Sequence, residues 1–452
     1  MKKQIKNPSF VLVLVVIQAY IGVSAQNPVI RNQFTADPTA RVFNGKVYVF
    51  PSHDISASDG KGRPGWFCME DYHVFSSENL TNWTDHGIIV SQNKVNWVDS
   101  ASYSMWAPDC IERDGKYYFY FPARGKQAEA SGEKGFSIGV AIAYNPEGPY
   151  VPQPEPIGGV CGIDPNVFID KDGQAYLYWS QHQIFVAKLK DNMLELDSEP
   201  KAIANLPEEG LKEGPFMFER NGIYYLTFPH VENKIERLEY ATGRHPLGPF
   251  EMAGVIMDES PMNCWTNHHS LFKYNNQWYL FYHQNEYSPA FDKCRSTCID
   301  SVFFNVDGTI QKVTPSRRGV GLTNAKDSIE IDRYSAISSV GARIDFIDSL
   351  NTFNGWKTVF SKTGAWVRYN AVDFGNKKLK NIRVRAIAEK GSTLQIRLNN
   401  ESGPLLCDVK VPESNSWITV EGKLTSFQKG IQNLVVVSTD NCLVEIDWVK
   451  FR

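Results

Sequence analysis

The sequence has little of several features that would point to a nucleic-acid or membrane partner. Lysine and arginine number 47 against 50 aspartate and glutamate residues, so the formal net charge is only −3. A balance this even provides no electrostatic attraction to nucleic acid or to an anionic membrane, and we expect neither as a partner. Beyond its N-terminus, the chain has no apolar run long enough to cross a membrane.

Closely spaced cysteines are lacking as well. The 8 cysteines are scattered, and the nearest pair, Cys294 and Cys298, has no second Cys or His pair at zinc-ligand spacing. This distribution excludes a dense disulfide framework and leaves one or two bridges open. We interpret Cys294 and Cys298 as structural residues.

The start of the chain has the three parts of an export signal. A basic MKKQIK segment precedes an apolar run from Phe10 to Val23, and Val23-Ser24-Ala25 supplies small residues for cleavage. We predict a signal peptide over residues 1–25 and an exported protein, periplasmic or extracellular, without membrane insertion after cleavage. An uncleaved anchor is the alternative.

A short pattern occurs five times: a polar turn and then an aromatic or β-branched strand. The copies recur roughly every fifty to seventy residues, which leaves room in each for a four-stranded antiparallel blade. Asn-Gly and Asp-Gly pairs indicate hairpins, because both central residues of a type I′ turn need positive φ. We therefore predict a five-bladed β-propeller over residues 26–320, with a β-sandwich carrying long insertions as the rival. The copies are NGKVYVF from Asn44, DGKYYFYF from Asp114, DGQAYLYW from Asp172, NGIYYLTF from Asn221 and NNQWYLFY from Asn275.

The remainder of the chain has a different pattern. A polar stretch with glycines after Pro315 indicates a linker, and short alternating strands follow, such as IRVRAIA from Ile382 and LQIRLNN from Leu394. We predict a β-sandwich, jelly-roll-like, over residues 321–452. The expected fold class is therefore all-β.

The five repeats place one residue each at a corresponding point of the innermost strand. We count nine residues back from the end of the turn, and one fewer in the first repeat, where the strand is shorter. Innermost strands line the channel of a propeller, so these side chains should form a ring. Neighbouring carboxylates raise one another's pKa, and a ring with three of them therefore indicates a functional site. The ring positions are Asp37, Trp106, Asp164, Glu213 and His268.

Three carboxylates in one channel suit glycoside hydrolysis. One carboxylic acid protonates the leaving oxygen, and one carboxylate acts on the anomeric carbon directly or through water. A third acidic group can tune the pKa of the acid. The sequence has no Ser-His-Asp order, Gly-rich phosphate loop or H-E-x-x-H helix, which leaves other hydrolase classes without a motif.

The blocks around these positions resemble glycoside hydrolase family 43 over the whole predicted propeller. The resemblance implies that Asp37 is the general base, Asp164 the group that tunes pKa and orientation, and Glu213 the general acid of an inverting hydrolysis. A water must then fit beside Asp37, so the two reacting carboxyl groups should lie roughly 6.5 to 9.5 Å apart. The blocks are FTADPTARVF around Asp37, MWAPD at 105–109, GIDPNVFIDKDG around Asp164, EGPFMFERNGIYYLT from Glu213, NHHSLFKYNNQWYLFYH around His268 and RSTCID from Arg295.

The same resemblance implies residues that bind the substrate or a metal ion. Arg295 matches an arginine that hydrogen-bonds sugar hydroxyls, and His268 matches a histidine beside a central calcium ion or an ordered water. A purely structural histidine is the alternative for His268. Trp106 is either a wall of the sugar subsite or a core ring, and Phe34 is a second wall candidate.

The last domain resembles carbohydrate-binding module family 6, through SIEIDRYS from Ser328, GAWVRYNAVDF from Gly364 and LVEIDWVKF from Leu443. In such modules two carboxylates, here Asp332 and Asp447, can hold a structural calcium ion. Glu445 stands where many members place a sugar-binding Asn, so a domain that only packs on the propeller is the alternative. Candidate sugar platforms, each also a candidate core ring, are Trp356, Trp366 and Trp417.

Together these features predict an exported, exo-acting, inverting glycoside hydrolase. The expected reaction releases β-D-xylose and/or α-L-arabinofuranose from xylan or arabinoxylan oligosaccharides, with calcium as a structural ion and no organic cofactor. Two alternatives stay open. An endo-arabinanase of the same fold requires an open groove, and a non-catalytic sugar-binding propeller would not need a paired acid and base.

Overall fold

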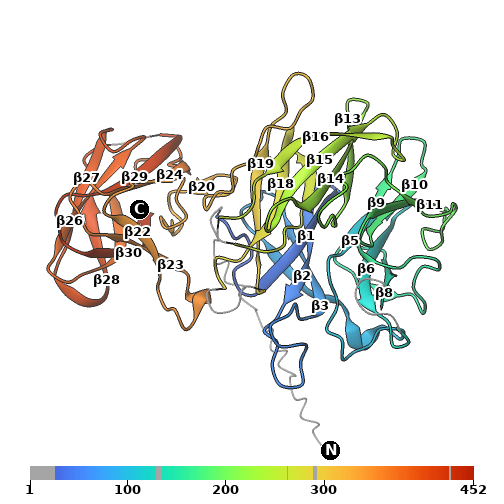
Figure 1. The fold of residues 1–452 in the computed structure, drawn as a ribbon. Helices are drawn as coiled ribbons and strands as arrows, with labels where there is room; N and C mark the ends of the chain where they lie inside the picture. The colour runs from blue at the N-terminus through green and yellow to red at the C-terminus, as the bar shows by residue number, and fades with distance from the viewer. Residues whose placement is uncertain (1–25, 129–134, 262, 289–292, 427–428) are drawn as a thin grey trace, which may run out of the picture.

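The computed structural model describes residues 26–128, 135–261, 263–288, 293–426 and 429–452. The predicted signal peptide lies outside these residues. The chain forms two lobes built almost entirely of strands, coloured blue to yellow and orange to red in Figure 1. This confirms the predicted all-β class, a propeller followed by a sandwich. Among the described residues, no helix combines the length and apolar character needed to cross a membrane.

The larger lobe is a propeller of five antiparallel sheets. Its first four blades have four strands each, and its fifth has three strands among the described residues. Blades 1 and 2 comprise β1 (Phe34–Phe43), β2 (Lys46–Asp54), β3 (Met69–Ser77), β4 (Thr84–Ser91), β5 (Asp109–Arg113), β6 (Lys116–Arg124), β7 (Phe136–Ala143) and β8 (Val151–Pro152). Blades 3 to 5 comprise β9 (Ile163–Ile169), β10 (Ala175–Ser180), β11 (Ile184–Leu189), β12 (Lys201–Ala202), β13 (Phe216–Arg220), β14 (Ile223–Val231), β15 (Glu236–Gly243), β16 (Phe250–Met257), β17 (Ser270–Tyr274), β18 (Gln277–Gln284) and β19 (Ser296–Val302).

The predicted polar turns close the first hairpin of each blade. Asn44, Asp114 and Asn221 have φ values of 51°, 54° and 54°, and a glycine with positive φ follows each of them. These residues tolerate the left-handed region that such turns require. The turn of blade 3 is longer, because Asp170 pairs with Gln174 across three residues.

Because of this longer turn, the predicted register of the channel ring is wrong in two of the five blades. In each blade we count back along the first strand from the last residue before the turn. The residue four positions earlier occupies the same position of the ladder in all five blades. Two residues before that position lie Asp37, Asp164 and His268, as predicted. In blades 2 and 4 the equivalent residues are Ala107 and Gly214, so Trp106 and Glu213 each stand one residue earlier. Counting from the end of the turn hid this offset.

Buried polar contacts tie the blades together below the ring. Asp109 accepts hydrogen bonds from Arg41 at 2.6 Å and from Asn166 at 3.0 Å, which links blades 1, 2 and 3. The Ser270 hydroxyl donates to the carbonyl oxygen of Pro38 at 2.8 Å and so links blade 5 to blade 1. Asp109 is 0% exposed, and its charge is stabilised by these donors.

The segment before β1 closes the propeller along its fifth blade. The Asn27 side chain donates to the carbonyl oxygen of Ile299 at 3.1 Å and accepts from the Ile299 N–H at 2.9 Å. The N–H of Val29 donates to the carbonyl oxygen of Thr297 at 2.9 Å. Strand β19 is thus joined to the start of the chain that enters blade 1.

Two sheets form the smaller lobe, with strand orders β20-β24-β29-β26-β27 and β22-β23-β30-β25-β28. Burial alternates residue by residue along β25 and β26, because alternate side chains of a strand face the shared core. The strands are β20 (Thr323–Asn324), β21 (Ala336–Ile337), β22 (Ala342–Phe346), β23 (Trp356–Phe360), β24 (Trp366–Asp373), β25 (Asn381–Ala388), β26 (Ser392–Leu398), β27 (Leu405–Val411), β28 (Ser414–Lys423), β29 (Ile431–Ser438) and β30 (Val444–Phe451).

The two lobes meet through aromatic rings and guanidinium groups. The Arg333 guanidinium lies 4.0 Å from the centroid of the Trp356 ring, and that ring lies 4.2 Å from Tyr287 of the propeller. Arg31 forms an ion pair with Glu330 at 2.6 Å across the same boundary. Trp356 is only 4% exposed, so it belongs to this interface and not to a sugar platform.

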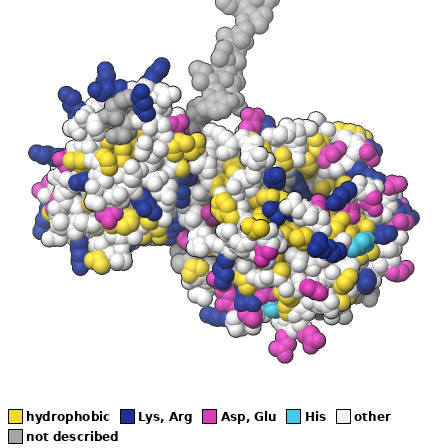
Figure 2. Space-filling model, turned by 90° about the horizontal axis from the view of Figure 1, so that it is seen from above, with side chains coloured by type: hydrophobic (Ala, Val, Ile, Leu, Met, Phe, Trp, Pro, Cys, Tyr) yellow, Lys and Arg dark blue, Asp and Glu magenta, His cyan; other side chains and the backbone are white. Residues whose placement is uncertain are grey.

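Figure 2 shows acidic and basic side chains interspersed over the visible face of both lobes. This surface agrees with the small net charge of −3. All eight cysteines are free, which answers the question of disulfide bridges that the sequence left open.

Candidate active site

Most of the predicted site residues meet at one cavity of about 480 Å³ in the propeller. Asp37, Asp164 and His268 reach it from equivalent positions of their blades, and Glu213 reaches it from one residue earlier. The cavity thus brings together residues that are up to 258 positions apart in the chain. The predicted residues that line it are Asp37, Trp106, Asp164, Glu213, His268 and Arg295.

Phe34 is the predicted wall residue that the structure does not place at the cavity. Its ring packs instead against Phe353 of the smaller lobe, with ring centroids 4.6 Å apart. Phe353 belongs to a short 3-10 turn, Thr352–Asn354, that precedes β23. The docking of the second domain therefore occupies the face of Phe34.

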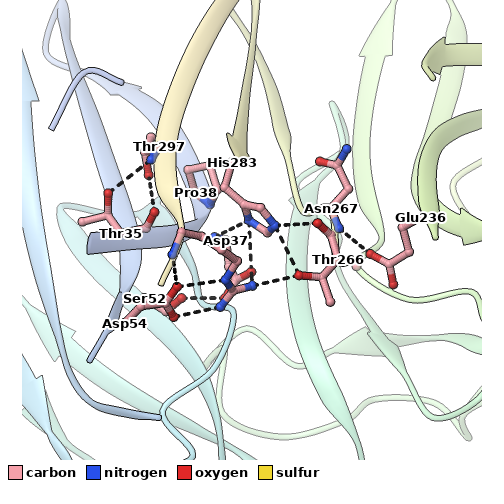
Figure 3. Close-up of polar contacts among 12 residues, drawn as sticks. Thr35, Asp37, Pro38, Ser52, Asp54, Glu236, Thr266, Asn267, His283 and Thr297 are labelled. Carbon is pink, nitrogen blue, oxygen red and sulfur yellow. Dashed lines mark hydrogen bonds and ion pairs between the residues drawn. The ribbon is translucent and has the colours of Figure 1, made fainter. Parts of the chain in front are cut away.

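Asp37 lies on β1 and is held by donors on both carboxylate oxygens, as Figure 3 shows. Arg295 donates to Oδ1 at 2.9 Å, and the Ser52 hydroxyl donates to Oδ2. Burial alone would raise the pKa of Asp37, but the Arg295 guanidinium lowers it below its ordinary value. Asp37 is therefore an ionised carboxylate at neutral pH, the state that a general base needs.

Arg295 connects Asp37 to a second buried carboxylate, Asp54. Its Nε and Nη2 atoms each donate to Asp54 at 2.9 Å. Burial raises the pKa of Asp54, although the same guanidinium opposes the rise. Arg295 is 3% exposed and fully engaged, so its first role in the structure is to position Asp37.

His283 fixes the backbone of Asp37 from the fifth blade. The Asp37 N–H donates to His283 Nδ1 at 3.1 Å, and Nε2 lies 2.9 Å from the carbonyl oxygen of Thr266. These partners assign the proton to Nε2. Burial, with the adjacent Arg295 charge, lowers the pKa of His283 to about 3, so the imidazole is neutral.

The backbone adopts a left-handed conformation at three points of the site, which strains the two that are not glycine. Asp37 and Asp164 have φ values of 49° and 57°, and each precedes a proline. Gly214, with φ 54°, also precedes a proline, and a Cβ there would lie 2.9 Å from His268 Nδ1. Left-handed conformations at non-glycine residues cluster at functional sites, because the surrounding structure has to enforce them.

Asp164 and Glu213 are joined through this glycine. The N–H of Gly214 donates to Asp164 Oδ2 at 3.0 Å, which sets the position of the peptide that follows Glu213. Glu213 itself precedes β13, and its own N–H lies 3.4 Å from the carbonyl oxygen of Pro229. Asp164 thus positions the segment that leads into β13 and carries Glu213, the candidate acid.

A fourth carboxylate, Glu236, faces Glu213 in the same cavity. Glu236 is 2% exposed and accepts a hydrogen bond from the N–H of Asn267, drawn in Figure 3. Burial raises the pKa of Glu236 well above its ordinary value, and a hydrogen bond with the Glu213 carboxyl raises it further. The Glu236 carboxyl therefore keeps its proton to higher pH than an isolated glutamate does, so this side of the cavity can act as an acid.

Aromatic rings form the cavity wall beside Asp37 and the Glu213–Glu236 pair. Phe67 and Trp265 stack with centroids 5.8 Å apart, and Trp66 lies 5.9 Å from Trp265. The predicted wall residue Trp106 packs on Phe136 at 4.6 Å and also lines the cavity. Apolar faces of sugars pack on rings of this kind.

The sequence pattern had indicated none of the partners Ser52, Asp54, Glu236 and His283. Glu236 begins β15, the third strand of its blade, whereas the repeat predicted only positions on first strands. His283 is the last residue but one of β18, and this polar end of a buried strand was the available signal. Ser52 and Asp54 end β2 in the same way, two residues apart and therefore on one side of the strand.

The residues around His268 fit a calcium ion poorly on their own. Burial lowers the pKa of His268, so the ring offers one neutral nitrogen. Calcium prefers about six to eight oxygen ligands. Asp37 and Asp109, whose charges act on His268, already bind the guanidinium groups of Arg295 and Arg41.

Asp332, in the smaller lobe, fits a cation better. It is 0% exposed, and neither carboxylate oxygen accepts a hydrogen bond, although Arg333 Nε lies 3.1 Å from Oδ2. Burial, and then the charge of Glu330, raise the pKa of Asp332 well above its ordinary value. Asp447, the other predicted ligand, is bound by Arg385 and would have to leave it.

Comparison with known proteins places this geometry among glycoside hydrolases. Residues 25–310 match Glycosyl hydrolases family 43, and residues 339–452 match Carbohydrate binding module (family 6). The chain is 37% identical over 340 residues to Xylosidase/arabinosidase 43A of Humicola insolens, covering 64% of this chain and 99% of that protein. It is 32% identical to Xylosidase/arabinosidase of Bacteroides ovatus, covering 61% and 94% of the two chains.

Two solved structures resemble different extents of the chain. A β-xylosidase/α-arabinofuranosidase from a compost microbial metagenome, in a calcium-free complex with xylotriose, is 34% identical with a TM-score of 0.57. It covers 64% of this chain and 98% of its own. An arabinoxylan arabinofuranohydrolase from Bacillus subtilis covers 95% of this chain and 99% of its own, with 23% identity and a TM-score of 0.54. The second likeness supports the two-lobed fold alone.

Proposed function

Because the chain belongs to glycosyl hydrolase family 43, we propose that it is an exo-acting, inverting enzyme that releases β-D-xylose and/or α-L-arabinofuranose. Xylan or arabinoxylan oligosaccharides are the proposed substrates. The observation that carries this proposal is one cavity with an ionised Asp37 on one side and, on the other, Glu213 in contact with Glu236, whose pKa is raised. An inverting glycosidase needs this combination of base and acid.

In the proposed reaction, Asp37 removes a proton from a water molecule. The water oxygen forms a bond to the anomeric carbon as the glycosidic C–O bond breaks, and Glu213 donates its proton to the leaving oxygen. Asp164 holds Glu213 in place through the N–H of Gly214. The products leave with inverted anomeric configuration, and the expected separation of the reacting carboxyls stays roughly 6.5 to 9.5 Å.

Two features support the proposed substrate. The relatives above are named as xylosidases/arabinosidases, and the metagenomic enzyme binds xylotriose. The cavity also combines buried carboxylates with the rings of Phe67, Trp106 and Trp265, a lining suited to a sugar that is polar at its edge and apolar on its faces.

Export, calcium and sugar binding by the smaller lobe belong to the same proposal. Signal cleavage after Ala25 would release the enzyme to meet polymeric substrate outside the cytoplasm. Asp332, with Asp447 once it leaves Arg385, is the proposed calcium-binding carboxylate of the smaller lobe, and the ion would stabilise its packing on the propeller. At His268 a calcium ion would depend on water for most of its ligands.

The test compares p-nitrophenyl β-D-xylopyranoside with p-nitrophenyl α-L-arabinofuranoside, and then xylo-oligosaccharides with debranched arabinan. Release from either aryl glycoside, with product of inverted configuration in the first proton NMR spectra, supports the proposal. Silence on both with cleavage of arabinan would favour an endo-arabinanase. No hydrolysis of any substrate, with binding retained, would favour a non-catalytic sugar-binding propeller.

A further inference from the structure

A cluster of metal-ligating side chains lies outside the active-site cavity, on the two middle strands of blade 1. His53 of β2 and Asp71 and His73 of β3 each offer one ligand atom, and these atoms all lie within 4.8 Å of one another. Asp71 and His73 are two residues apart on one strand and therefore share a face. The histidine side chains keep 21% and 13% of their accessible surface, so an ion can reach them from solvent.

Two imidazoles and one carboxylate form a ligand set of definite preference. Neutral imidazole suits zinc and related divalent transition metals, and three protein ligands leave a position for water. We propose that His53, Asp71 and His73 bind one divalent transition-metal ion of the zinc class. The inference is independent of the proposed glycosidase activity, because none of the three residues lines the active-site cavity.

An outer-sphere carboxylate orients one of the ligands. Asp85 of β4 lies 2.9 Å from Nδ1 of His73, which places the proton on that nitrogen and leaves Nε2 as the ligand atom. Metal-binding histidines characteristically donate their second N–H to such a carboxylate, which fixes the tautomer and the ring. The strand pair thus supplies both the ligand and its support.

The local charge favours a cation at His53. The carboxylate of Asp71 lies against His53, and Asp54 and Glu70 are the neighbours of these two residues along β2 and β3. Without a metal, His53 Nδ1 lies 2.7 Å from Asp71 Oδ1, and this contact stabilises the negative charge of the carboxylate. A divalent ion would replace that contact with stronger bonds to the same two side chains.

An ion bound at His53 would also affect the structure that supports the active site. His53 stands between Ser52 and Asp54, which both hold the Asp37 side of the active site, directly and through Arg295. Alternation along β2 directs His53 to the opposite face. An ion there would fasten the strand end that supports Asp37 without entering the cavity.

The test uses the full mature chain, stripped with a chelator and titrated with zinc chloride by calorimetry, with metal content and thermal midpoint measured in parallel. We expect one zinc ion per chain and a higher midpoint when it is bound. His53→Gln and His73→Gln should each abolish this binding. Asp85→Asn should keep the fold and weaken binding about 10- to 100-fold. His245→Gln, at an exposed histidine on another blade, is the matched control and should bind like the parent.

Two results would overturn the proposal. One is the absence of zinc uptake by the stripped parent protein. The other is unchanged stoichiometry and affinity in His73→Gln and Asp85→Asn, which would place the ion elsewhere, for example on a free cysteine. Hydrolysis of the aryl glycosides, measured on the same samples, reports the proposed function separately.

Discussion

On the blade 1 side of the active-site cavity Asp37 faces a guanidinium, whereas on the blade 4 side Glu213 faces a second carboxyl, Glu236. Both sides are buried, so the difference in chemistry comes from the partner and not from exposure. Arg295 lowers the pKa of Asp37, while burial and Glu213 raise that of Glu236. One cavity thereby holds a base and a proton donor at the same pH, which is how environment assigns roles to similar side chains.

The largest expected effect comes from removing the base. Asp37→Asn keeps the shape and the Ser52 contact but cannot accept a proton from water. We expect kcat/KM to fall by roughly 10²- to 10⁴-fold on oligosaccharides and aryl glycosides alike. Steady-state kinetics on both substrates checks this, and Asp408→Asn, at an exposed position of β27 in the smaller lobe, makes the same change of charge as a control. Activity near that of the parent would remove Asp37 from the reaction.

The second effect depends on the leaving group, which makes it the sharpest test of the comparison. Glu213→Gln should lose roughly 10²- to 10⁴-fold on xylo-oligosaccharides, because their leaving hydroxyl needs a proton. The loss on p-nitrophenyl glycosides should be smaller, because p-nitrophenolate leaves without one. Substrate binding, followed by calorimetry, should survive. Equal losses on both substrates would contradict the role of Glu213 as the acid.

The third effect separates positioning from chemistry. Arg295→Met removes the charge that outweighs burial at Asp37, so the pKa of Asp37 should rise. A base that protonates at higher pH loses activity earlier as the pH falls, and the acidic limb of kcat/KM should therefore move upward. Two buried carboxylates also lose their partner, which should cost about 3 to 5 kcal/mol of unfolding free energy.

The acidic limb and the urea midpoint are the two measurements for Arg295→Met. Arg220→Met, whose guanidinium lies 4.3 Å from the Phe304 ring and far along β13 from the cavity, makes the same chemical change elsewhere. An unmoved acidic limb in a folded Arg295→Met protein would mean that Arg295 does not set the ionisation of Asp37.

The fold was predictable because its signals are local. Asn44, Asp114 and Asn221 adopt the positive φ that their hairpins need, and each precedes a strand with alternating or continuous apolar residues. Those turns fix where each blade begins, and hence that Asp37, Asp164 and His268 are equivalent. Nothing in the sequence indicates the extra turn residue of blade 3. Trp106 and Glu213 were therefore placed one residue from their true register.

The rest of the site depends on contacts between distant elements. Glu236 reaches Glu213 because the third strand of blade 4 starts at the cavity, which no periodic pattern on a first strand can indicate. Phe34 lost its predicted role because Phe353, in another domain, covers it. Trp356 likewise packs at a domain boundary whose location no single-strand pattern specifies.

The smallest expected effect probes the carboxyl pair itself. Above its upper pKa the Glu213–Glu236 pair has lost both protons, and no proton remains for the leaving oxygen. Repulsion between the two carboxylates raises that upper pKa. Glu236→Gln removes the repulsion while keeping an amide in the same space, so the basic limb of kcat/KM should move to lower pH by about one unit.

The full pH profile is the measurement that checks Glu236→Gln, because a merely structural role would lower activity without moving one limb. The acidic limb should stay in place, since the Asp37 side keeps Arg295 and Ser52. Glu251→Gln, at an exposed position of β16 in the same blade, should leave both limbs unchanged. If Glu236→Gln moved the acidic limb instead, the two sides of the cavity would titrate as one unit, and base and acid could not be assigned to separate environments.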